Sequence, residues 1–237
     1  MKNKILIYGG SGGVGKSLAL KLKSLDYDIH LAGKNEESLS ALSNEISSDY
    51  TIGNVLEESF FEEATSNAGE NLSAVVYAVG TINLKSFSRL TSNDFSTDYA
   101  INVIGAANAV KAAINPLKSN KGSIVFFSSV ASQVGFPMHG SIGAAKAALN
   151  GLTISLAAEL APNVRVNAIA PSLTETPLAS RVLANDKVKE SIANSHPMKR
   201  LGTPSDIASL AAFLISDEAT WITGQILGLD GGRSNIA

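Results

Sequence analysis

Short apolar runs alternate along the chain with longer stretches in which apolar residues recur at helical spacing. The apolar runs predict strands at residues 4–8, 29–32, 74–79, 123–127 and 164–169. The longer stretches predict helices at residues 14–25, 36–46, about 94–117 and about 141–160. A regular succession of strand and helix indicates βαβ units, in which successive strands lie parallel.

Several predicted strands are apolar at every position rather than at every second one. Ala74-Val75-Val76 and Ile124-Val125-Phe126-Phe127 are examples. Such runs are typical of parallel strands that helices cover on both faces. The chain has 237 residues and shows no internal repeat. The pattern therefore predicts one α/β domain over residues 1–237, a doubly wound (Rossmann) parallel sheet with helices on both faces.

The least regular stretch of the chain runs from residue 171 to about residue 204 and is rich in proline. A long insertion in a compact α/β domain is usually functional. We therefore predict that residues 171–204 form a substrate lid with a mostly apolar lining. The candidate lining residues are Leu173, Leu178, Val182, Leu183 and Met198.

Composition and charge narrow the functional class. Hydrophobic residues make up 45% of the chain and charged residues 17%, and the net charge is −2, which argues against disorder and against a nucleic-acid partner. The absence of cysteine excludes disulfides and thiolate zinc sites, and with only three histidines we expect no metal centre. The apolar run at residues 5–8 is too short for a signal peptide, and none reaches membrane-spanning length. We expect a cytoplasmic protein without a membrane partner.

A glycine-rich loop, Tyr8-Gly9-Gly10-Ser11-Gly12-Gly13-Val14-Gly15-Lys16-Ser17, follows the first predicted strand. It satisfies three phosphate-binding patterns at once: G-x-G-x-x-G from Gly10, G-x-x-x-G-x-G from Gly9, and the Walker A pattern from Gly10 to Ser17. In all three, residues without a Cβ let the backbone approach a phosphate at the N-terminus of the next helix. Phosphate binding is predicted whichever pattern applies.

The Walker A interpretation requires an acidic residue after a second strand to hold magnesium. The candidate strands end in Val79-Gly80 and Phe127-Ser128, without such a residue. Only the run at residues 226–229 is followed by an aspartate, Asp230, far along the chain. A dinucleotide site is favoured over a nucleotide triphosphatase.

Further landmarks cover nearly the whole chain. Beside the glycines at 9, 13 and 15 they are Asn102 in a predicted helix, Ser128-Ser129 after a strand, the segment Arg165-Val166-Asn167-Ala168-Ile169-Ala170-Pro171-Ser172, and Asp230-Gly231-Gly232. In this order and spacing they resemble the short-chain dehydrogenase/reductase family. The resemblance implies oxidation or reduction of a small alcohol or carbonyl substrate with a nicotinamide coenzyme.

The resemblance also implies roles for individual residues. Ser129 would hold the substrate oxygen, Lys146 would bind the nicotinamide ribose and assist proton transfer, and Asn102 would belong to a proton relay. The coenzyme-binding positions that it implies are Gly9, Ser11, Gly13, Val14, Gly15, Lys34, Asn35, Asn54, Val55, Ala78, Gly80, Lys146, Pro171, Thr174 and Thr176. Family members usually associate through their two long helices, so a homodimer or homotetramer is expected.

One position departs from the family. Its catalytic tyrosine would stand thirteen residues after Ser129 and four before Lys146, and both counts lead to Ile142. A hydrocarbon side chain cannot donate a proton, and general acid catalysis contributes about 10²- to 10⁴-fold in rate. Four substitutes stay open: His139, Ser141, Tyr99, or a water held by Ser129 and Asn102.

The residues after the second strand bear on the choice of coenzyme. Gly33 carries no charge that would repel a 2′-phosphate, and Lys34 and Asn35 offer a cation and an amide to bind one, so NADP(H) is favoured over NAD(H). Two functions remain open on the sequence: an NADP(H)-linked oxidoreductase with an atypical proton donor, or an NADP(H)-binding pseudoenzyme that senses the coenzyme or serves as a scaffold.

Overall fold

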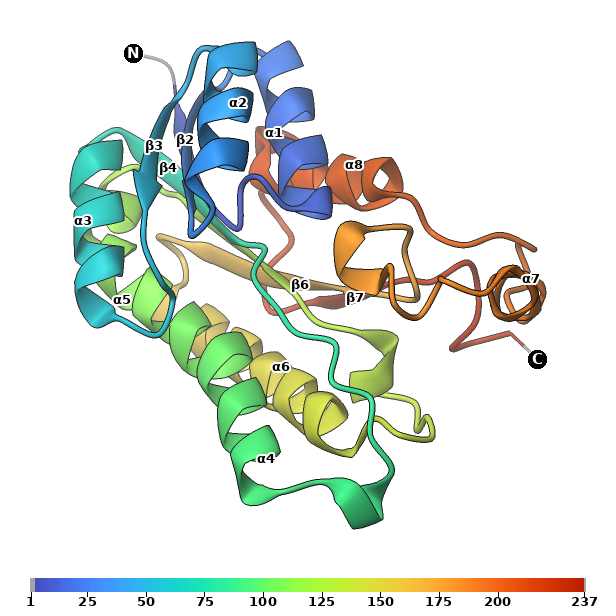
Figure 1. The fold of residues 1–237 in the computed structure, drawn as a ribbon. Helices are drawn as coiled ribbons and strands as arrows, with labels where there is room; N and C mark the ends of the chain where they lie inside the picture. The colour runs from blue at the N-terminus through green and yellow to red at the C-terminus, as the bar shows by residue number, and fades with distance from the viewer. Residues whose placement is uncertain (1–2, 237) are drawn as a thin grey trace.

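The computed structural model describes residues 3–236 and confirms a doubly wound parallel sheet (Figure 1). The strands lie in the order β3-β2-β1-β4-β5-β6-β7, and every neighbouring pair is parallel. Their bounds are β1 (Lys4–Tyr8), β2 (Asp28–Gly33), β3 (Asp49–Ile52), β4 (Leu72–Tyr77), β5 (Ser123–Phe127), β6 (Arg165–Pro171) and β7 (Ile226–Leu229). The strand order changes direction between β1 and β4, and in such sheets ligands bind at the carboxyl ends of the strands at this point.

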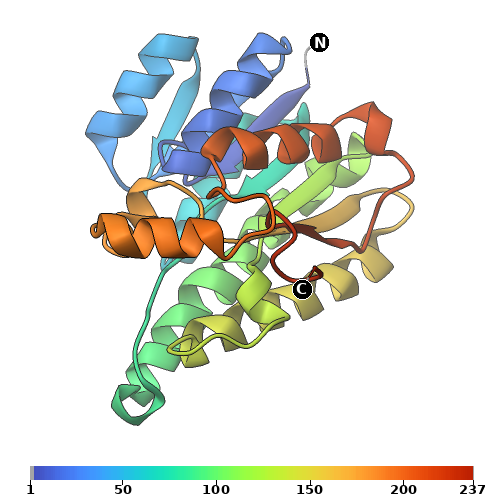
Figure 2. The ribbon, with the colours of Figure 1, turned by 90° about the vertical axis from the view of Figure 1, so that its right-hand side faces the viewer.

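Helices cover both faces of the sheet (Figure 2). On one face lie α1 (Gly13–Ser24), α2 (Glu36–Ile46) and α8 (Pro204–Ile215); on the other lie α3 (Glu58–Ala68), α5 (Gly105–Ser119) and α6 (Gly140–Leu160). Side chains alternate along each strand. Ile5 and Ile7 therefore belong to the core on the face covered by α1, α2 and α8, whereas Leu6 and Tyr8 belong to the core on the face covered by α3, α5 and α6. This double coverage explains the continuous apolar runs of the sequence.

The helix predicted for residues 94–117 is interrupted. α4 (Ser92–Tyr99) passes through a π-helical turn, Ala100–Ile104, into α5. Tyr77 at the end of β4 donates its hydroxyl proton to the Ile101 carbonyl at 2.7 Å, and a Cβ on Gly105 would lie 2.2 Å from the Tyr77 oxygen. The widened turn thus admits the Tyr77 hydroxyl, and it carries Asn102.

Five strands and α-helices escaped the sequence prediction: β3, β7, α3, α8 and α7 (Asp186–Asn194). β3 is a four-residue edge strand with one buried side chain, and polar residues dilute the apolar pattern of α3 and α7. The stretch 171–204 is therefore not irregular throughout, since Asn185 caps α7 within it. The strand predicted at residues 74–79 also ends earlier, at Tyr77, so Ala78 and Val79 already belong to the loop beyond the sheet.

The helices of the described chain vary in length, and α6 extends over 21 residues. Among residues 3–236, no helix combines the length and the apolar character that crossing a membrane requires.

Candidate functional site

A cavity of about 360 Å³ opens at the carboxyl ends of β4, β5 and β6. Its walls come from residues 78–82 after β4, residues 127–131 after β5, residues 171–174 after β6, and the start of α6. The lining is mostly apolar. The ionisable side chains on it are His139, Lys146 and Arg233, and no aspartate or glutamate of the described residues lines it.

The glycine loop forms the entry to α1 beside this cavity. Gly9 has a φ of +74°, which favours glycine, and a Cβ on Gly15 would stand 2.2 Å from the Gly9 carbonyl oxygen. The N-terminus of α1 has no side-chain cap and no acidic residue in its first turn. Its free N–H groups and positive dipole end fit a phosphate group.

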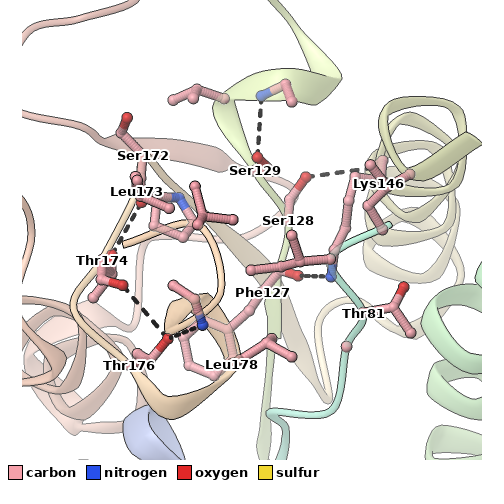
Figure 3. A pocket seen from close by; sticks show the side chains of 18 of the residues that line it. Thr81, Phe127, Ser128, Ser129, Lys146, Ser172, Leu173, Thr174, Thr176 and Leu178 are labelled. Atoms are coloured by element: carbon pink, nitrogen blue, oxygen red, sulfur yellow. Dashed lines mark hydrogen bonds between the residues drawn. The ribbon is translucent and has the colours of Figure 1, made fainter. Parts of the chain in front are cut away.

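The segment after β6 closes over the same helix end. A Cβ on Gly13 would lie 2.9 Å from Pro177 and 3.0 Å from Thr176. Thr174 and Thr176 line the cavity on this side, and the Thr176 hydroxyl caps the short turn that follows (Figure 3). The structure therefore brings Thr176 to the glycine loop and Thr174 to the cavity beside it.

Ser129 faces the cavity between the 172–176 segment and Lys146 (Figure 3). Its Oγ accepts a hydrogen bond from the Ala131 N–H at 3.1 Å, which fixes the side-chain rotamer. The hydroxyl proton is left to donate to a ligand oxygen. Its neighbour Ser128 is turned into the protein and donates to the Lys146 carbonyl and to Ser132.

Lys146 reaches the cavity from α6, although the residue is almost fully buried. Its ammonium group donates to the Phe127 carbonyl at 2.6 Å. Burial lowers the pKa of Lys146 to about 8, and the negative charge of Asp98 opposes this shift. The side chain is thus a cation held by few partners, with donors available for the hydroxyl groups of a ligand.

Asn102 belongs to a buried polar network that sequence reasoning missed. Its amide donates to the Thr81 hydroxyl at 2.9 Å and to the Asp98 carbonyl at 2.8 Å, while the Thr81 hydroxyl donates to the Asp98 carboxylate at 2.6 Å. Asn102 Oδ1 has no partner. A Cβ on Gly80 would lie 3.2 Å from this oxygen and 3.3 Å from Lys146 Nζ. The free acceptor and the ammonium group therefore flank one backbone position.

Ile142 lines the cavity together with Ser129 and Lys146, as the spacing predicted, and is 6% exposed. His139, which precedes α6, lines the same cavity. Its Nδ1 lies 2.8 Å from the Pro137 carbonyl, and its ring contacts Phe136 at 5.6 Å between centroids. Because a carbonyl only accepts, Nδ1 carries a proton, and Nε2 stays available.

The other two side chains considered as proton donors lie elsewhere. Tyr99 is 47% exposed and borders a shallow hollow on the outer face of α4 and α6, so it belongs neither to the cavity nor to the core. Ser141 is buried and accepts a weak hydrogen bond from Asn83 at 3.4 Å. Neither residue lines the cavity that contains Ser129 and Lys146.

The residues predicted at the adenosine end lie around the ends of β2 and β3, away from the cavity. Lys34 is exposed at the end of β2, whereas Asn35 caps α2 through its side-chain oxygen. The Ser38 hydroxyl donates to Ser11 at 2.9 Å and so joins α2 to the glycine loop. Asn54 accepts from the Leu56 N–H.

The lysine of the Walker A pattern does not reach toward the loop's phosphate site. Lys16 Nζ lies 3.1 Å from the Glu45 carboxylate, and both side chains are half exposed. Asp230 accepts hydrogen bonds from the N–H groups of Gly232 and Ser234. This arrangement disfavours the triphosphatase interpretation.

The predicted lid lines the cavity only in part. Leu173, Leu178 and Val182 contribute to the walls. Leu183 does not, and Met198 is exposed, which corrects the expected lining at these two positions. Phe136 and Arg233 contribute instead, from segments in which the sequence showed no motif for substrate binding.

The doubly wound sheet and the glycine loop at the entry to α1 define a nucleotide-binding fold of the Rossmann type. A family model described as enoyl-(acyl carrier protein) reductase matches residues 9–234. The chain is 35% identical to a 3-oxoacyl-(acyl-carrier-protein) reductase FabG from Rickettsia bellii, over 96% of this chain and 95% of that protein. It is 32% identical to a tropinone reductase homolog from Arabidopsis thaliana, over 96% of this chain and 90% of that protein.

Solved structures agree with these relatives. A short-chain type dehydrogenase/reductase from Mycobacterium ulcerans superposes with a TM-score of 0.92 at 28% identity, covering 98% of this chain and 90% of that one. ElxO with NADP bound superposes with a TM-score of 0.90 at 28% identity, covering 98% of this chain and 99% of that one. The chain belongs to the short-chain dehydrogenase/reductase family.

Proposed function

We propose that the protein is an NADP(H)-linked oxidoreductase that interconverts a carbonyl and an alcohol, with His139 in place of the missing tyrosine as proton donor. The observation that carries this proposal is that His139, Ser129 and Lys146 line one cavity beside the glycine loop. NADP(H), when bound, supplies or takes up the hydride. The remaining task of the protein is to hold the substrate and to move one proton.

The chain offers residues for each part of the coenzyme. The N–H groups at the start of α1 and the space kept by Gly9, Gly13 and Gly15 fit the pyrophosphate. Lys34 is exposed and available to a 2′-phosphate, and Lys146 is available to ribose hydroxyls. We further assign Asn54 and Val55 to the adenine, and Ala78, Pro171, Thr174 and Thr176 to the nicotinamide end.

Proton transfer is assigned to His139 Nε2. The Pro137 carbonyl holds Nδ1–H and so orients the ring. In the reductive direction the imidazolium gives the Nε2 proton to the substrate oxygen, while the Ser129 hydroxyl donates a hydrogen bond to that oxygen. In the oxidative direction the neutral imidazole accepts the proton at Nε2.

One observation favours a second function. Ile142 presents hydrocarbon to the cavity at the position where the family carries its acid. The alternative is therefore an NADP(H)-binding pseudoenzyme with little or no dehydrogenase activity, which senses the coenzyme or serves as a scaffold.

The test combines two substitutions with NADPH and a broad panel of carbonyl compounds. If His139 is the donor, His139→Gln lowers kcat/KM by about 100-fold while the Kd for NADPH stays unchanged. Tyr99→Phe is the matched control, because this exposed ring lies outside the cavity, and it should leave the rate unchanged. Ile142→Tyr tests whether a tyrosine at this position provides the family's usual proton donor.

The two functions give opposite results. An inactive parent that binds NADPH and gains reductase activity with Ile142→Tyr supports the pseudoenzyme. An active parent whose rate does not change in His139→Gln excludes His139 and leaves a bound water as the donor.

The hollow on α4 and α6 supports self-association. Phe95, Tyr99 and Ile104 are large apolar side chains exposed around it. We propose that this face forms the contact of a homodimer, or one of the contacts of a homotetramer.

A further inference from the structure

Arg233 lines the cavity from the C-terminal segment of the chain. It is far from the glycine loop in sequence, but in space it lies next to the predicted lid. It shares the cavity wall with Phe136, Ser172 and His139. A guanidinium group in a mostly apolar cavity is costly unless an anion accompanies it. We therefore expect a negatively charged ligand beside Arg233.

The side chain is held in place from two directions. The guanidinium carbon lies 4.7 Å above the centre of the Phe136 ring, a cation–π contact. The backbone before it turns tightly through Gly231 and Gly232, which have φ values of +62° and +88°. Asp230 closes that turn by accepting from the Gly232 and Ser234 N–H groups, each at 2.9 Å.

No ion pair within residues 3–236 neutralises the charge of Arg233. The one hydrogen bond of Arg233 to a side chain of these residues is a long one, 3.4 Å from Nη1 to Ser172 Oγ. Asp230 acts on it electrostatically, but the Asp230 oxygens are taken by the turn and by Ser234 Oγ. The guanidinium thus has donors to spare on the side of the cavity.

We propose that the substrate carries a carboxylate and that Arg233 binds it, while the carbonyl or alcohol group lies at Ser129. The inference rests on the proposed function and narrows it to oxo acids or hydroxy acids. One guanidinium matches the single charge and the planar, two-oxygen geometry of a carboxylate, whereas a phosphate monoester brings about two charges to a site with one arginine. No aspartate or glutamate of the described residues lines the cavity wall, and Asp230, which acts on Arg233 electrostatically, is hydrogen bonded within its own turn.

The experiment measures ligand binding and turnover separately. Acetoacetate and levulinate are compared with their neutral carboxamides, acetoacetamide and levulinamide, and with a phosphorylated ketone, dihydroxyacetone phosphate. Calorimetry is run on the protein with and without NADPH, and NADPH oxidation is followed on the same samples. We expect the acids to bind more tightly than their amides, and Arg233→Met to weaken acid binding by about 10- to 100-fold without affecting the amides.

Arg233→Lys keeps the positive charge but loses the two parallel N–H donors of the guanidinium group. It should retain part of the preference for acids that Arg233→Met loses. Arg181→Met is the matched control, because Arg181 is exposed in the lid segment and does not line the cavity; it should change nothing. NADPH binding should be the same in all variants, which excludes a general loss of structure.

The outcomes separate this inference from the proposed function. Acid binding that depends on Arg233 without any turnover upholds the inference and contradicts the oxidoreductase proposal. Turnover that is equal for acids and amides, and unchanged in Arg233→Met, overturns the inference and leaves the oxidoreductase proposal standing. A preference for the phosphorylated ketone over the acids overturns it as well.

Discussion

Two regions of the candidate site are built differently. The backbone side is the glycine loop at the entry to α1, beside the cavity: Gly9 with its positive φ, free N–H groups at a helix start, and glycines whose missing Cβ atoms keep space open. The side-chain wall belongs to the cavity itself and comes from separate segments, above all Ile142, His139, Phe136 and Arg233. Both sides rest on the same parallel sheet.

This difference shows which parts of the chemistry a chain can alter without losing the fold. A backbone cradle depends on φ values and close approaches, so a single added methyl group disturbs it. A side-chain wall tolerates replacement more readily, because Ile142 lines the cavity from α6 and a change of its side chain leaves the backbone conformation of the glycine loop as it is. The proposed coenzyme binding and the proposed proton transfer therefore depend on different parts of the site.

The largest effect is expected from Gly15→Ala on the backbone side. The new Cβ would meet the Gly9 carbonyl oxygen at 2.2 Å, and the backbone of the loop must shift to relieve the contact. We expect NADPH binding to weaken by more than about 100-fold, and the free energy of unfolding to fall by about 1–3 kcal/mol. Calorimetry and urea denaturation measure the two quantities.

Gly151→Ala in α6 is the control for this substitution. No atom outside the helix lies within 4 Å of the added Cβ, so the helix should gain stability, by about 1 kcal/mol. NADPH binding within twofold of the parent in Gly15→Ala would contradict the backbone cradle.

Local patterns sufficed to predict the backbone side. The glycine spacing marked the close approaches of the loop at the entry to α1. On the side-chain wall, the counts from Ser129 and Lys146 placed Ile142, and the three residues line one cavity. These predictions succeed because each rests on a strand end or a helical repeat. The fixed geometry of those elements carries a residue count over into space.

The side-chain wall was harder to predict, because its members come from loops and from the chain end. Arg233 and Phe136 meet only after the C-terminal turn packs beside the loop after β5, and no periodicity relates them. Asp98 and Thr81 join Asn102 through the π-helical turn, whose register depends on Tyr77. Tyr99, considered a possible proton donor from the sequence, is exposed instead of facing the cavity, because helical periodicity does not reveal which partner covers a face.

A second effect is expected at Lys146, which reaches the cavity from α6. The pKa of Lys146 is about 8 in the folded protein against 10.5 for an ordinary lysine. Below pH 8 both folded and unfolded states hold the proton, and the cost of the buried charge is fully present. Between pH 8 and 10.5 only the unfolded state holds it, so this contribution to stability improves as pH rises.

The measurement compares the parent with Lys146→Met by urea denaturation across this range, without coenzyme. The stability of the parent relative to the variant should rise by about 3 kcal/mol from pH 8 to 10.5. Tyrosine titration affects both proteins equally and cancels. Lys111→Met, at an exposed position of α5, should show no such trend, and a flat difference for Lys146→Met would mean that its ammonium group is well solvated.

The smallest effect is expected at the outer end of the backbone side, where Lys34 is exposed. A solvated ion pair contributes at most about 1 kcal/mol, and replacing the cation by an anion roughly doubles the change, so Lys34→Glu should shift the ratio of the NADPH and NADH dissociation constants about tenfold toward NADH. The shift should shrink at high salt, because exposed charges are screened. Lys111→Glu makes the same charge change on α5 and should leave the ratio unaltered. An unchanged ratio in Lys34→Glu would contradict the assignment of the 2′-phosphate to Lys34.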